Sequence, residues 1–268
     1  MISRLLQAFD RRVVYWLLAT ALAFTTRLAL AAPIEYGDFG PDPPGVTMYL
    51  GVMESSATDP VPPGRYGPPE LIGDVLDFDP TEFVAFATAG DSDITDVQLN
   101  FTLMTLPGTA ATSLTLSEGG DYTLFGGGTA LTQVAAGAII KVKILEVDGV
   151  PLADPVESNL NGSVAFDLIA NPGIVQPWSL GLFVDFESIL NGSETPYELG
   201  VSKAEVVIDD QLLAISDADS IAFIAKKDFI IRPNIVPEPT SLAMMTIALA
   251  GYGVAFRRRI LRILKRRS

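Results

Sequence analysis

The sequence predicts an all-β protein, a mostly antiparallel β-sandwich with jelly-roll-like connections. From Glu82 to Arg232, short runs rich in β-branched and aromatic residues are separated by glycine, asparagine or aspartate. No long helical period occurs between the two ends of the chain. Polar and apolar residues alternate from Lys141 to Val147, as in a half-buried strand, and Asp148-Gly149 follows as a turn signal. Many short strands joined by tight turns are typical of sandwiches.

Each run delimits one expected strand of this sandwich. In chain order the expected strands are Glu82–Thr88, Thr95–Leu103, Asp121–Phe125, Ala138–Val147, Ser163–Leu168, Ser179–Phe186, Lys203–Asp209, Gln211–Ser216, Ile221–Ala225 and Asp228–Arg232. The sandwich domain is predicted over residues 71–233. The proline- and glycine-rich segment 32–70 is expected to wrap the domain edge or extend from it, apart from one apolar run, Val46–Met53.

One internal similarity is visible in this domain. Glu157–Ser163 is repeated in part as Glu187–Ser193, and both copies end in Asn-Gly-Ser. Asn-Gly favours tight turns with positive φ angles, so two equivalent loops at one end of the sandwich are expected. Asn100, Asn161 and Asn191 also fit the N-x-S/T sequon, for which turn chemistry is the preferred interpretation over glycosylation.

Residues 1–31 have the pattern of a signal peptide. Arg4, Arg11 and Arg12 precede the apolar run Val13–Phe24, and Ala29 and Ala31 form an A-x-A cleavage signature. An apolar run of this length is short for a membrane span, which needs roughly 20 residues. Cleavage by signal peptidase after export is therefore predicted, and an uncleaved N-terminal anchor helix is the alternative.

The C-terminal tail, residues 234–268, has three parts in a fixed order. Pro237, Glu238 and Pro239 form a stiff segment that cannot join a helix. A short transmembrane helix is expected at about 241–256, followed by the basic end 257–268, which begins with Arg257, Arg258 and Arg259. By the positive-inside rule, both basic ends stay in the cytoplasm and the domain between them lies across the membrane.

This tail resembles that of the PEP-CTERM family. The resemblance is confined to the tail and implies that exosortase, a membrane protease, recognises Pro237, Glu238 and Pro239. It implies that the apolar helix and Arg257–Arg259 hold the chain in the membrane before processing. It also implies a role at the cell envelope or in an exopolysaccharide-rich biofilm. An ordinary single-span anchor with a proline-rich stalk is the alternative.

Composition excludes several functions. The chain has a net charge of −14, yet 30 of its 32 acidic residues lie between the two signals, because only Asp10 and Glu238 fall outside. Such an acidic domain repels nucleic acid. The chain has no cysteine and no histidine, so neither disulfides nor histidine-dependent nucleophiles can form. We therefore expect a non-enzymatic structural or interaction module without a resident cofactor.

Two alternatives and one metal site remain open at this level. A glycan-binding or adhesive module would need exposed aromatic rings, for which Trp178, Tyr49, Tyr66, Tyr122 and Tyr197 are the candidates. A polysaccharide hydrolase would need two facing carboxylates, and no motif favours any pair. Acidic loops are weak calcium candidates, with Asp91 and Asp93 foremost, and a solvated acidic turn is the preferred interpretation.

Overall fold

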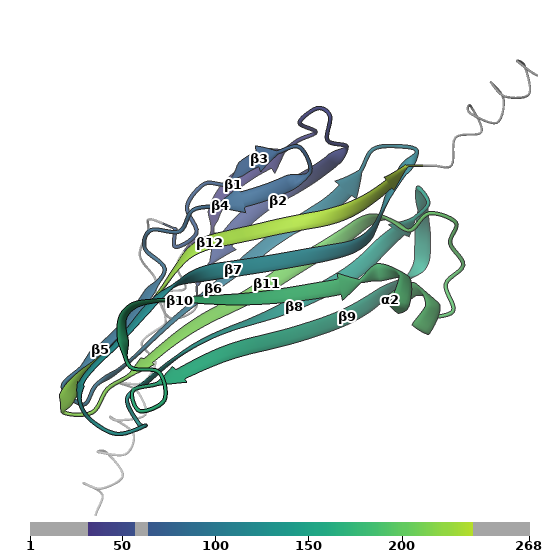
Figure 1. Cartoon of the computed structure of the whole chain (residues 1–268). Helices are drawn as coiled ribbons and strands as arrows, with labels where there is room; N and C mark the ends of the chain where they lie inside the picture. The colour runs from purple at the N-terminus through teal and green to yellow at the C-terminus, as the bar shows by residue number, and fades with distance from the viewer. Residues whose placement is uncertain (1–31, 57–63, 238–268) are drawn as a thin grey trace, which may run out of the picture.

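The computed structural model describes residues 32–56 and 64–237, which form twelve strands and one short helix (Figure 1). The predicted signal peptide, Glu238, Pro239, Arg257–Arg259 and the predicted transmembrane helix lie outside the described residues. Within these residues, no helix has the length and apolar character needed to cross a membrane. The elements are β1 (Ile34–Phe39), β2 (Thr47–Ser55), β3 (Glu70–Ile72), β4 (Val75–Phe78), β5 (Val84–Thr88), β6 (Ser92–Thr105), β7 (Thr109–Gly127), β8 (Gln133–Val147), β9 (Val150–Asp167), β10 (Gly173–Asp185), α2 (Phe186–Gly192), β11 (Val201–Ile215) and β12 (Asp219–Pro237).

The strands form two antiparallel layers. The first layer has the order β1-β2-β6-β11-β8-β9. The second layer begins with β10, which pairs with β7, and β7 pairs with β12. The other edge of β12 pairs with two short strands, β5 and β4. The layer ends with β3, which pairs with β4. One pairing, Val201 with Ala111, connects the layers at one end. The described residues therefore confirm the predicted all-β, mostly antiparallel fold.

The core lies between the layers, because inward and outward side chains alternate along each long strand. In β11, for example, Val206, Ile208 and Leu212 are buried. An aromatic group fills one part of this core and consists of Tyr66, Phe78, Phe83 and Phe229.

Several strands are longer than the sequence pattern predicts. Lys203–Asp209 and Gln211–Ser216 are parts of one strand, β11, and Ile221–Ala225 and Asp228–Arg232 are parts of β12. The register of β12 against β7 shifts between Lys226 and Asp228, which is a β-bulge. A bulge reverses the alternation of side chains, and the sequence pattern therefore looks like two strands.

Segment 32–70 differs from expectation as well. It contains β1 and β2, and β2 pairs with β6 over Thr47–Ser55. It therefore supplies the edge of the first layer and is not separate from the sandwich.

The prediction of two equivalent Asn-Gly loops is wrong. Asn161 lies within β9, opposite Ile139, and Asn191 lies in α2, which Asp185 caps by accepting a hydrogen bond from the Ser188 N–H at 3.1 Å. Pairing with β8 along the whole length of β9 overrides the local turn preference of Asn161-Gly162. Asp148-Gly149 does form the tight β8–β9 turn, with φ values of 53° and 75°.

Candidate functional site

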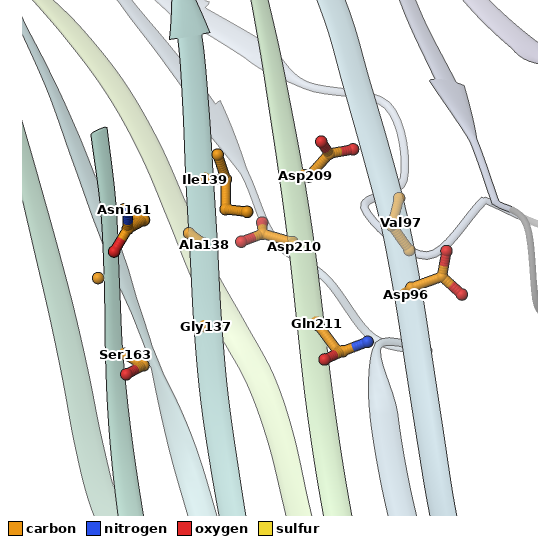
Figure 2. Close-up of a pocket in the computed structure, with 11 residues that line it drawn as sticks. Asp96, Val97, Gly137, Ala138, Ile139, Asn161, Ser163, Asp209, Asp210 and Gln211 are labelled. Atoms are coloured by element: carbon orange, nitrogen blue, oxygen red, sulfur yellow. The ribbon is translucent and has the colours of Figure 1, made fainter. Parts of the chain in front are cut away.

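A groove of about 580 Å³ crosses the outer face of the first layer, where β6, β11, β8 and β9 lie side by side (Figure 2). Cross-strand register places Asp96, Gln211, Gly137 and Ser163 in one row. The next outward row is Gln98, Asp209, Ile139 and Asn161. A second hollow of about 330 Å³ includes Lys141, Lys143, Asn159 and Glu205 further along the same strands.

The groove is hollow because its central position is a glycine. A Cβ added at Gly137 would meet the Gly162 carbonyl oxygen at 3.6 Å and the Ser163 Cβ at 3.7 Å, which is ordinary contact. Neighbouring atoms therefore leave the space above Gly137 open, and this space could hold a side chain or a ligand.

Asp209 is a charged group beside the groove that two neighbouring side chains hold in place. Its carboxylate accepts a hydrogen bond from Gln98 Nε2 at 2.7 Å and forms an ion pair with Lys141 Nζ at 2.7 Å. Amide, hydroxyl and carboxylate groups of this kind can bind a ligand rich in hydroxyls. None of the lining residues is aromatic, so ring stacking does not contribute here.

A second polar cluster lies inside the core. Lys226 Nζ of β12 is 2.7 Å from Glu118 Oε2 of β7 and 2.6 Å from Asp210 Oδ2 of β11. The side chain of Lys226 is 1% exposed and those of Glu118 and Asp210 are 0% exposed. The Tyr66 hydroxyl donates a hydrogen bond to Asp210 Oδ2. The cluster therefore joins the two layers beneath the groove.

The electrostatics of this cluster follow from its burial. The pKa of Glu118 is raised to about 8, because burial, together with the charge of Asp210, outweighs the lowering by Lys226. Burial, followed by the charges of Asp210 and Glu118, raises the pKa of Tyr66 well above its ordinary value. The phenol therefore remains a hydrogen-bond donor at neutral pH.

The bulge in β12 and a glycine in β7 place the lysine. The bulge lets both Lys226 and Phe229 face the core, with the exposed Lys227 and Asp228 between them. Gly120 pairs with Lys226, and a Cβ there would overlap the carbonyl oxygen of Ala225. The sequence analysis did not identify this cluster. A lysine directly after the apolar run Ile221–Ala225 is the signal that could have indicated it.

The predicted calcium residues do not form a site. No three acidic side chains within residues 32–56 and 64–237 are arranged to hold a metal ion. Asp93 instead accepts a hydrogen bond from the Phe86 backbone N–H at 2.8 Å. Asp91 lies just before β6, where its carbonyl oxygen accepts from Ser216 N–H.

The aromatic residues proposed as a sugar platform are also not available. Trp178, Tyr49, Tyr66 and Tyr122 are buried, and Tyr197 packs partly buried against the core. Trp178 Nε1 donates to the carbonyl oxygen of Ala225 at 3.0 Å, as packing within the second layer requires. These rings therefore do not form a stacking surface, and Trp178 packs against its neighbours, as is usual for a single tryptophan at the start of a strand.

Comparison with known proteins gives one specific match. A family model described as the PEP-CTERM protein-sorting motif matches residues 236–259. No curated protein sequence matches the chain.

The solved structures that match the chain are only weakly similar to it. The chain is 11% identical to TmCBM61, solved with β-1,4-galactotriose, over 60% of this chain and 70% of that one, with a TM-score of 0.20. It is 14% identical to the N-terminal cellulose-binding domain of Cellulomonas fimi β-1,4-glucanase C, over 78% of this chain and 99% of that one, with a TM-score of 0.19. It is 12% identical to bacteriophage CBA120 tailspike protein 4, over 75% of this chain and 19% of that one, with a TM-score of 0.20. Scores this low support no conclusion about function.

The family match agrees with the order of elements in the tail, where Pro237, Glu238 and Pro239 precede an apolar stretch and Arg257–Arg259. The chain therefore carries a PEP-CTERM protein-sorting motif in its C-terminal tail, which indicates an exported protein that is anchored in the membrane until exosortase, a membrane protease, processes it.

Proposed function

We propose that this protein is a non-enzymatic β-sandwich of the bacterial surface or extracellular matrix, and that it binds exopolysaccharide through the groove on its first layer. The groove is the observation that supports this function best. Its Asn161, Ser163 and Gln211 side chains offer donors and acceptors along one open face. A chain of sugars presents hydroxyl groups at regular intervals and can lie across several strands.

Two features support binding without catalysis. The chain has no histidine and no cysteine. Glu118, whose pKa is raised to about 8, lies in the core and not in the groove, so it cannot reach a bound sugar as a general acid. Incubation with exopolysaccharide should release no new reducing ends. Measurable release by the pure protein would contradict the proposal.

Filling the groove tests the binding role. Gly137→Leu places a side chain in the free space without overlap at Cβ, and should abolish retardation of the protein in gels that contain exopolysaccharide from the native cells. Ser117→Ala, on the exposed face of the second layer, is the matched control and should be retarded like the natural protein. Equal retardation of the Gly137→Leu protein would assign binding to another surface.

Intact mass tests processing at both ends. Protein recovered from outside its native cells should lack residues 1–31, through cleavage after Ala31, and the part of the tail that follows Pro237, Glu238 and Pro239. A mass that retains Ser241–Ser268 would instead indicate a plain membrane-anchored ectodomain.

A further inference from the structure

We propose that the folded domain forms an amide bond between the side chains of Lys226 and Asp210, and so links its two layers covalently. The bond joins Lys226 Nζ to the Asp210 Cγ. Its formation requires no ligand, although Asp210 is also one of the residues around the groove.

The first argument is geometric. Nζ lies 2.6 Å from Asp210 Oδ2 and 2.7 Å from Glu118 Oε2, so the lysine nitrogen is in contact with both carboxyl groups. All three side chains are almost completely removed from solvent, with exposed fractions of 1% for Lys226 and 0% for Glu118 and Asp210. Asp210 Oδ1 has no hydrogen-bond partner among the described residues. The amine is therefore held, away from water, against the carboxyl group that it is proposed to attack.

The second argument is the surrounding medium. Nζ lies 4.8 Å from the centre of the Phe83 ring and 5.0 Å from that of Phe229. Such apolar surroundings disfavour separated charges. Amide formation requires a free amine and a neutral acid, which one proton transfer within the cluster provides.

The reaction then balances without an oxidant or a further reactant. The amine lone pair of Lys226 attacks the Asp210 Cγ, and the C–N bond forms as a C–O bond breaks. One hydroxide equivalent leaves from Asp210 and combines with a proton lost from Nζ, so that one water is released. Once this water has left the core, it cannot hydrolyse the amide.

Neighbouring groups fit the roles that this step needs. The Tyr66 hydroxyl donates to Asp210 Oδ2 and polarises that carboxyl for attack. Glu118 carries a proton at neutral pH, because burial raises its pKa to about 8, and it can pass a proton between Nζ and the leaving oxygen. Asp210 is the acceptor of the bond because its carboxyl receives the Tyr66 hydrogen bond, which polarises it for attack.

Peptide mapping of the natural protein tests the bond directly. Trypsin acts after Lys203, so Asp210 and Lys226 fall in one peptide, Ala204–Lys226. Trypsin does not cleave the peptide bond after Lys226 when the side chain of Lys226 is acylated. The digest should therefore contain Ala204–Lys227, lighter by one water (about 18 Da), with no fragment ions between the two joined residues. Recovery of linear Ala204–Lys226 at full mass as the main species would overturn the proposal.

Variants assign the roles. Glu118→Gln should yield the linear peptide, because the proton carrier is lost, while circular dichroism reports an intact fold. Asp209→Asn and Lys227→Gln change the neighbouring exposed residues and should still show the loss of water. Glu118 lies in another tryptic peptide, Tyr66–Lys141. If that peptide were found cross-linked to the peptide that contains Lys226, the bond would be on Glu118, which would contradict the assignment to Asp210.

Discussion

Gly120 shows how closely the backbone packs beside the buried lysine. Gly120→Ala would drive a methyl group into the Ala225 carbonyl, which belongs to the backbone and cannot rotate away. The free energy of unfolding should fall by about 1–3 kcal/mol, as for other overpacked sites. Denaturant titration measures the change. Gly137→Ala is the control and should raise the free energy of unfolding by about 0.5 kcal/mol, because the added methyl group has space there.

Asp148 provides a pH-dependent contribution at the β8–β9 turn. Partial burial raises its pKa, but hydrogen bonds from the Gly200, Glu198 and Leu199 N–H groups outweigh burial and lower the pKa below its ordinary value. The ionised form is therefore favoured in the folded state. Its contribution to stability is complete above the unfolded pKa of about 3.9 and is lost as pH falls through the folded pKa.

Asp148→Asn tests this assignment. The variant should be less stable than the natural protein at neutral pH, and the difference should shrink towards zero as the medium is acidified below about pH 4. Thermal melts across that range measure it. A difference that is constant with pH would assign the effect to turn geometry, which asparagine also tolerates, and not to charge.

At the residue scale, the sequence predicted one turn correctly, Asp148-Gly149, but not the two Asn-Gly turns and not the buried charged cluster. Asp148-Gly149 carried its own signal, because both residues tolerate positive φ. The buried cluster of Lys226, Glu118 and Asp210 has no such signal in the sequence. Its members are distant in sequence, and only the packing of β12, β7 and β11 brings them together. The groove could not be predicted either, because its rows cross four strands whose pairing order is a property of the tertiary fold.

Among the elements, β5 illustrates how an edge strand is protected. Its N–H at Phe86 donates to the Asp93 carboxylate, and its carbonyl at Val84 accepts from the Thr95 hydroxyl at 2.6 Å. Side chains of β6 thus occupy backbone groups that could otherwise pair with another chain. The aspartate predicted as a calcium ligand protects this edge.

Removing that protection should promote self-association. Asp93→Ala frees the Phe86 N–H beside the exposed Phe86 ring, and sedimentation velocity should show a dimer that grows with protein concentration. Asp91→Ala is the control and should remain like the natural protein. A monomeric Asp93→Ala protein would mean that the edge is blocked by other means.

Element type was predictable because alternation marks a half-buried strand wherever one side faces the core, as in β8. Strand ends were less predictable. The bulge in β12 interrupts the alternation of polar and apolar residues without ending the strand. The polar run Asp209–Gln211 in β11 does the same, because its middle residue, Asp210, is a polar side chain that faces the core. The strands of segment 32–70 were obscured by prolines and glycines around them.

For the whole molecule, the proposed bond sets the resistance to heat. It closes a loop between Asp210 and Lys226, and cross-links around loops of this size stabilise proteins by about 3 kcal/mol. Glu118→Gln should therefore melt roughly 6–12 °C below the natural protein. Differential scanning calorimetry measures the shift, with Asp209→Asn as the control. Equal melting points would mean that the bond is absent or adds no stability.

The ladder between β12 and β7 continues to the pairs Val236–Ala110 and Pro237–Thr109, so the sorting motif, which begins at residue 236, starts inside the folded domain. In mechanical terms, force applied to the tail enters the domain at the end of β12. A pull along the axis of β12 loads its ladder with β7 in shear, and at Lys226 the proposed amide would pass that tension to β11 through a covalent link. Force that enters the domain at Pro237 would then be carried by both layers.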